Sequence, residues 1–205
     1  MSDAPFEQHP ADSVYHRRLP IGERLDATSL TEGLPWAIEE LTMRPLEPML
    51  VPEIPRGGEV DPAECRTCQP NVHTIWQDEH WKVTAGWEPG GLPFIGAIAP
   101  REHWLLEDAP HEVLAAYGPL MQRISEAVKS IPGVARCHFA RWNDGSAHLH
   151  MWALARPAGM MQGRGAILEF WNDILPAIDD DMMREHLDIV ANALAAGGGE
   201  TYPNR

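Results

Sequence analysis

The sequence lacks a long apolar run. Charged residues, Gly or Pro interrupt every apolar stretch within a few residues, and none approaches the ~20 apolar residues that a bilayer-spanning helix needs. The first residues also lack an apolar stretch after a basic start. We therefore expect no signal peptide, a cytoplasmic location and no membrane partner.

Positive charge is scarce as well. Lys and Arg number 16 against 30 Asp and Glu, which gives a net charge of −14. Such a chain is a poor electrostatic partner for a phosphate backbone, so we expect no binding of duplex nucleic acid. A small phosphate ligand needs only a few local donors and stays possible.

Cysteine is rare, with three residues in 205. Three cysteines do not indicate a set of structural disulfides, which are rare in a reducing compartment. Cys65 and Cys68 form a Cys-x-x-Cys pair, which indicates metal or redox chemistry instead. An apolar content of 44% excludes wholesale disorder, and the length suits one hydrophobic core.

The distribution of proline predicts the domain plan. Prolines recur too often before residue 60 for long helices or a central strand. We expect residues 1–60 to be an irregular extension that packs on the main body from about residue 30. The main domain is expected at 61–160, with a helical C-terminal extension, 161–205, packing on it.

Alternating apolar and polar residues predict antiparallel strands. Two segments in which apolar residues recur with a period of about 3.6 residues predict helices. A helix is expected from Pro110 to about Lys129, with Asp108 as its cap. The fold class is therefore α+β rather than a doubly wound parallel sheet. The other expected elements are strands within 72–85, 91–100, 134–142 and 147–155, and helices at 166–176 and 180–196.

Four residues have the chemistry of a metal site. Cys65 and Cys68 place two thiolates within reach of one ion, and His103 and His148 can complete a tetrahedral Cys2His2 set. That set is typical of structural zinc, and soft thiolates favour zinc over magnesium or calcium. The alternative, two free thiols in a loop, stays open for a bare Cys-x-x-Cys.

A second cluster follows the turn at 143–146. On an extended strand, His148, His150 and Trp152 point to one face. Two imidazoles and an indole side by side are hard to explain as core packing, so this face is a candidate site.

The segment HLHMW after a Gly-Ser turn resembles the histidine triad (HIT) superfamily, whose motif alternates histidines with apolar residues. One branch, containing galactose-1-phosphate uridylyltransferase, has Gln at the third position. The segments TIWQDEHWKV, APREHWLLED and NDGSAHLH also resemble parts of the family, over about residues 65–157. The resemblance implies a HIT-like antiparallel sheet of about five strands with flanking helices, a nucleoside phosphate substrate and a homodimer.

The resemblance also implies roles for residues. Arg156, four residues after Trp152, favours the register in which His148 binds structural Zn²⁺ and His150 is the nucleophile that forms a nucleotidyl-histidine intermediate. Trp152 then replaces the His or Gln of the third position. Ser146 and the turn amides around Gly145 hold phosphate oxygens.

Further substrate contacts are less specific. Asn143 donates to phosphate or forms the turn, and Arg156, Gln162 or Arg164 meets the leaving group. Glu88 lies close to the position where family members hold the ribose with an acidic residue. Trp76 and Trp87 are candidates to stack on a base or on a partner chain.

Three functions remain open at this stage. The first is a zinc-stabilised nucleotide hydrolase or nucleotidyltransferase acting at an α-phosphate. The second is a catalytically inactive nucleotide-binding module, which Trp152 motivates. The third, a Cys-x-x-Cys oxidoreductase, is weak because no βαβ pattern surrounds Cys65.

Overall fold

The computed structural model describes residues 48, 50–69 and 73–202, apart from the side chain of Gln162. Its contacts divide the chain into two units, Met1–Pro55 and Arg56–Arg205. The segment expected to pack from about residue 30 lies mostly outside the described residues. In the described part of the chain, no helix is long and apolar enough to cross a membrane. All elements below belong to the second unit.

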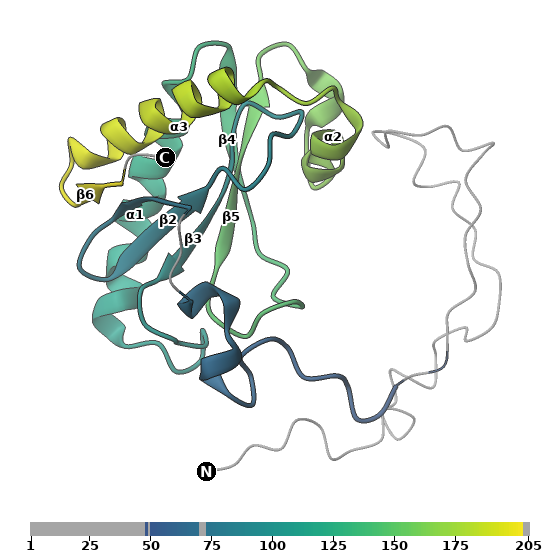
Figure 1. The fold of residues 1–205 in the computed structure, drawn as a ribbon, viewed down its shortest axis with the longest axis vertical. Helices are drawn as coiled ribbons and strands as arrows, with labels where there is room; N and C mark the ends of the chain where they lie inside the picture. The colour runs from purple at the N-terminus through teal and green to yellow at the C-terminus, as the bar shows by residue number, and fades with distance from the viewer. Residues whose placement is uncertain (1–47, 49, 70–72, 203–205) are drawn as a thin grey trace. The chain divides into compact units, whose positions relative to one another are not determined.

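Six strands form one antiparallel sheet (Figure 1), in the order β4-β5-β3-β2-β1-β6. The expectation of an antiparallel α+β fold is confirmed, with one strand more than the five expected. The bounds are β1 Thr74–Gln77, β2 Trp81–Ala85, β3 Ile95–Pro100, β4 Val134–Ala140, β5 Met151–Pro157 and β6 Glu200–Thr201.

The sixth strand, β6, consists of only two residues. Gly198 and Gly199 have positive φ values of 104° and 87°, which turn the chain back after helix α3 (Asp180–Ala195). Thr201 then pairs with Trp76 of β1, and the Tyr202 amide donates to the Ile75 carbonyl at 3.0 Å. Two residues are too few to show an alternating pattern, so the sequence does not predict this strand.

The turn between β1 and β2 forms around Asp78. Its side-chain oxygen Oδ1 accepts from the amides of His80 (3.0 Å) and Trp81 (2.8 Å). A short carboxylate that satisfies two following amides is a common device for tight turns. The expected two strands with a QDEH turn are thereby confirmed.

Two long helices, α1 His111–Lys129 and α3 Asp180–Ala195, pack together and on the same sheet (Figure 1). Asp179 caps α3, because its Oδ1 accepts from the Met182 amide at 2.7 Å. The expected cap of α1 by Asp108 is wrong. Pro110 is the N-cap, and Asp108 lies two residues before it.

The alternation of β5 separates two faces of the sheet. Ala153 and Ala155 join the main core beneath α1 and α3. Trp152 and Leu154 belong to a smaller cluster on the opposite face, which also contains Leu168 of the short helix α2 (Leu168–Ile174). The face opposite α1 and α3 is therefore the face on which a site beside Trp152 is built.

Candidate functional site

The four predicted metal ligands lie together. The ligand atoms of Cys65, Cys68, His103 and His148 are all within 4.8 Å of one another. Cys65 Sγ is 3.5 Å from His148 Nδ1, and Cys68 Sγ is 3.3 Å from the same nitrogen and 3.4 Å from His103 Nδ1. The Cys-x-x-Cys pair comes from a short 3-10 turn, Arg66–Cys68, whereas the histidines come from two other loops.

These distances fit a tetrahedral metal ion. With metal–sulfur bonds of about 2.3 Å and metal–nitrogen bonds of about 2.0–2.1 Å, sulfur and nitrogen ligands lie about 3.5 Å apart. Cys65 and His148 are fully buried, and Cys68 is at the surface. The four donors therefore form a closed set for one cation, without a position for a substrate.

Neighbouring groups prepare His148 to be a ligand. Its Nε2–H donates to the Pro100 carbonyl at 3.0 Å, so Nδ1 carries the lone pair that faces the thiols. Burial lowers the pKa of His148 to about 4, which keeps the imidazole neutral. Burial and the adjacent Cys65 raise the pKa of Cys68 to about 11. A bound divalent cation reverses that preference and favours the thiolate.

Gly58 gives a direct test of how tightly the ligands are packed. Its φ is +77°, and a Cβ there would lie 2.7 Å from Cβ of Cys65 and 2.9 Å from Cε1 of His103. Gly58→Ala should therefore both destabilise the protein and weaken metal binding. Gly133→Ala is the matched control, because Gly133 has φ +80° with no atom within 4 Å.

We expect Gly133→Ala to cost about 1–2 kcal/mol from backbone strain alone, with metal affinity unchanged. Gly58→Ala should cost more and should release the metal at a lower chelator concentration. Urea unfolding and chelator titration measure both effects. Equal metal affinity in the two variants would show that Gly58 is not constrained by the ligands.

His150 has the environment expected of a nucleophile. Its Nδ1–H donates to the backbone carbonyl of His148 at 2.8 Å, which leaves Nε2 with a free lone pair. The two histidines lie just before β5 rather than in it, because β5 begins at Met151. The expectation of a regular strand from residue 147 is wrong. The Leu149 amide instead donates to the Trp104 carbonyl, outside the sheet.

A pocket of about 410 Å³ contains His150. Its volume lies within the usual range for small-molecule sites. The pocket brings together five residues singled out from the sequence, namely Trp87, Gly145, Ser146, His150 and Trp152. The other lining residues are Arg66, Thr67, Thr84, Ala97 and Ala99.

Five of the predicted substrate contacts are not among the residues that line this pocket, and one of them, Arg164, is exposed just after the turn Met161–Gly163. Asn143 forms the turn with φ 64°, and its carbonyl accepts from Arg56. Arg156 is buried, and its Nη1 donates to the carbonyls of Pro157 and Met160. Glu88 is exposed beyond β2. The backbone of Gln162 lies in the turn Met161–Gly163, and its side chain is not described.

Sequence reasoning missed Arg66, Thr67 and Thr84. Thr84 shares the sheet face of the pocket, and the first two lie inside the Cys-x-x-Cys motif. The two tryptophans proposed to stack on a base lie in different environments. Trp76 is fully buried in the main core, so it is not available for stacking. Trp87 lines the pocket, with its ring centroid 5.6 Å from that of Trp152.

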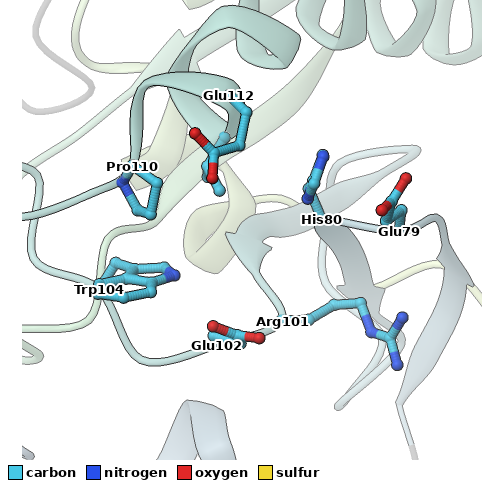
Figure 2. Close-up of a pocket in the computed structure, with 8 residues that line it drawn as sticks. Glu79, His80, Arg101, Glu102, Trp104, Pro110 and Glu112 are labelled. Atoms are coloured by element: carbon cyan, nitrogen blue, oxygen red, sulfur yellow. The ribbon is translucent and has the colours of Figure 1, made fainter.

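A second, more polar pocket of about 480 Å³ lies elsewhere (Figure 2). Figure 2 shows Glu112 pointing from α1 toward the side of the pocket that holds Glu102 and Trp104. Both of these are chain neighbours of the candidate ligand His103. None of the residues predicted to act in catalysis or substrate binding lines this pocket, so the candidate reaction site is the pocket with His150.

No protein-family model matches the chain, and no curated protein matches it in sequence. Solved structures do match. A histidine triad protein from Bradyrhizobium japonicum has a TM-score of 0.50 at 17% identity, with 59% of this chain and 89% of that one covered. A Zn-bound histidine triad family protein from Mycobacterium smegmatis has a TM-score of 0.44 at 23% identity, covering 62% and 86%.

A uridylyltransferase mutant matches with a TM-score of 0.47 at 19% identity, covering 68% of this chain and 50% of that one. The match to the Bradyrhizobium protein covers most of its length and agrees with the antiparallel sheet and the expected resemblance. The chain therefore has the fold of the histidine triad proteins.

Proposed function

We propose that the protein is a zinc-stabilised nucleotide hydrolase or nucleotidyltransferase that acts at an α-phosphate through a nucleotidyl-histidine intermediate. The observation that carries this proposal is the state of His150. Its Nδ1–H is held by the His148 carbonyl at 2.8 Å, and its ring lines a pocket of substrate size. A neutral imidazole with one nitrogen fixed and the other free can attack phosphorus.

The turn before His148 provides the phosphate site in this proposal. Gly145 and Ser146 line the pocket with His150. The backbone of Gly57 fixes this turn through two hydrogen bonds. The Gly57 amide donates to the Gly145 carbonyl, and the Ala147 amide donates to the Gly57 carbonyl, both at 3.1 Å. The Ser146 hydroxyl makes only a long contact of 3.5 Å with Gly57, so it can turn toward a phosphate oxygen.

Zinc is the metal that the donor set fits best, since two thiolates and two imidazoles neutralise a divalent ion in tetrahedral geometry. The ion is structural, because all four positions are filled by protein. A cytoplasmic location belongs to the same proposal, and the three free cysteines, Cys65, Cys68 and Cys137, fit a reducing compartment. The domain plan, an extension at 1–60, a core at 61–160 and a helical C-terminal part, belongs to the same proposal.

The second candidate is a nucleotide-binding module without catalysis. Trp152 favours it, because an indole N–H can donate a hydrogen bond but cannot transfer a proton. Incubation with an adenosine phosphoramidate, a nucleotide sugar and a dinucleoside polyphosphate separates the two candidates. Release of mononucleotide from any of them supports the enzyme. Binding of nucleotide with no release from all three supports the module.

We also propose a homodimer formed through α1. Val113, Leu120 and Ile124 of α1 are buried in the core, while Leu114 remains 37% exposed and Tyr117 is half-buried. The apolar residues thus extend beyond the face that the core covers. Light scattering at micromolar concentration should give twice 22.8 kDa. A mass near 22.8 kDa would rule the dimer out.

A further inference from the structure

The described residues that line the pocket around His150 include no Asp, Glu, Cys, Lys or Tyr that could protonate a leaving group. Among these described lining residues, His150 is the only one of a type that commonly serves as a general acid or base. His150 cannot act as this acid, because its Nδ1–H is held by the His148 carbonyl and its Nε2 is the attacking atom.

An aromatic surface lies beside His150 in this pocket. Trp152 and Trp87 lie with ring centroids 5.6 Å apart, and the Trp152 ring is 6.4 Å from that of His150 at 89°. The indole N–H can donate a hydrogen bond to a departing atom, but its proton stays on nitrogen. A strongly basic leaving group, such as an amine or an alkoxide, therefore receives no proton from this side of the pocket.

Among the described residues that line the pocket, Arg66 is the one cation, and it belongs to residues 65–68, which we call the metal loop. Arg66 lies between the two candidate thiolate ligands. Within the described part of the chain, no hydrogen bond or ion pair involves its guanidinium. The backbone beneath it is fixed, because the Cys68 amide donates to the Cys65 carbonyl at 3.1 Å.

Lys82 fixes the same loop from the sheet. This lysine is 8% exposed, and its Nζ donates to the Thr67 carbonyl at 2.5 Å. The loop therefore presents a free positive charge on a rigid support. Such a charge can stabilise an anion without any proton transfer.

We propose that this pocket acts on substrates whose leaving group departs as an unprotonated anion, and that Arg66 pairs with that anion. The inference rests on the proposed function. His150 Nε2 donates its electron pair to the α-phosphorus, and the bond from phosphorus to the leaving oxygen breaks. The oxygen keeps that electron pair and leaves as an anion, while the proton on Nδ1 stays in its hydrogen bond to His148.

The second step also balances without an acid. Water, or an acceptor hydroxyl, attacks the phosphorus, the phosphorus–nitrogen bond breaks, and its electron pair returns to Nε2. The proton of the attacking oxygen goes to solvent. The substrate class is therefore a nucleoside 5′-phosphoric anhydride, such as a dinucleoside polyphosphate, a nucleotide sugar or an adenylate. Phosphoramidates, which release a basic amine, are excluded as good substrates.

Matched probes test the leaving group. The probes are the 4-nitrophenyl and phenyl esters of one nucleoside 5′-monophosphate, together with the phosphoramidate and the dinucleoside polyphosphate. The wild-type protein should cleave the 4-nitrophenyl ester and the polyphosphate. It should cleave the phenyl ester and the phosphoramidate at least about 10²-fold more slowly, the usual contribution of a general acid.

Trp152→His supplies the missing acid. This variant should raise the ratio of kcat/KM for the phosphoramidate to kcat/KM for the 4-nitrophenyl ester by about 10²-fold. Trp142→His is the matched control, because Trp142 is 46% exposed and is not among the residues lining the pocket, and it should leave the ratio unchanged. Circular dichroism and metal content identify a variant that has not folded.

Arg66→Ala tests the cation. It should lower kcat/KM for the dinucleoside polyphosphate by about 10- to 100-fold, the usual value of a charged hydrogen bond, with metal content unchanged. Arg136→Ala, an exposed arginine of β4, is the control. Equal effects of the two variants would overturn the assignment of Arg66.

The outcomes separate this inference from the proposed function. If the wild type cleaves the phosphoramidate as fast as the 4-nitrophenyl ester, the leaving-group proposal is wrong and the nucleotidyl chemistry stands. If none of the probes is cleaved while nucleotide binds, both proposals are wrong and the protein is a binding module. A steep preference for the weakly basic leaving groups supports both.

Discussion

Replacing His150 by alanine is expected to abolish nucleotidyl chemistry while leaving the fold and the metal in place. We expect kcat to fall by about 10⁴-fold or more, since no other group in the pocket offers a route through a covalent intermediate. His150 is not in the candidate ligand cluster, and its Nδ1–H donates to the His148 carbonyl. Mononucleotide release measures the loss, and elemental analysis follows the metal.

A matched histidine controls for side-chain removal. His186 of α3 also bonds a backbone carbonyl, that of Pro93 at 2.7 Å, but it is not among the residues that line the pocket. His186→Ala should keep its activity. His150→Gly with added imidazole should recover part of the activity. If His148→Ala kills activity and keeps the metal while His150→Ala loses the metal, the two roles must be exchanged.

Loss of one buried thiolate is expected to have the largest effect on stability. Cys65 is fully buried and 3.5 Å from His148 Nδ1. Cys65→Ser should therefore release the metal and lower the free energy of unfolding by several kcal/mol, because metal binding contributes directly to folding. Cys137→Ser is the control, since Cys137 lies on β4 and outside the ligand cluster.

A chelator separates the contribution of the metal to stability from the contribution of the packing of the Cys65 side chain. Treatment with a chelator should bring the wild-type protein down to nearly the stability of Cys65→Ser, whereas Cys137→Ser should lose as much on chelation as the wild type does. Urea unfolding with and without chelator measures this. An unchanged midpoint for the chelated wild type, with well under one metal ion per chain at purification, would contradict the metal site.

Much of the fold could be predicted, because strand alternation and turn residues act locally. The QDEH turn is an example, since Asp78 satisfies the amides two and three residues later. Asp108 shows the limit of such reasoning. A cap must lie immediately before the first helical turn, and the start of α1 at His111 depends on where the chain packs.

The candidate site also contains residues that could be predicted from the sequence and residues that could not. The ligands and His150 could be predicted, because residue type and spacing express their chemistry. Arg66 could not, since the sequence does not say which side of the metal loop meets the pocket. The departure of His148 and His150 from regular strand geometry also depends on distant partners, such as Trp104 and Gly57. Arg156 served as a sequence marker for the register of the motif, which stays a prediction, and its guanidinium donates to carbonyls at the end of β5.

The central claim is that His150 forms a covalent nucleotidyl intermediate. A quenched reaction with the 4-nitrophenyl ester, followed by digestion and mass spectrometry under neutral to basic conditions, tests it most directly. We predict the mass of one nucleotidyl group on the peptide that contains His150, lost in acid and absent from His150→Ala. An adduct on His148, or consumption of substrate with no adduct on either histidine, would contradict the account.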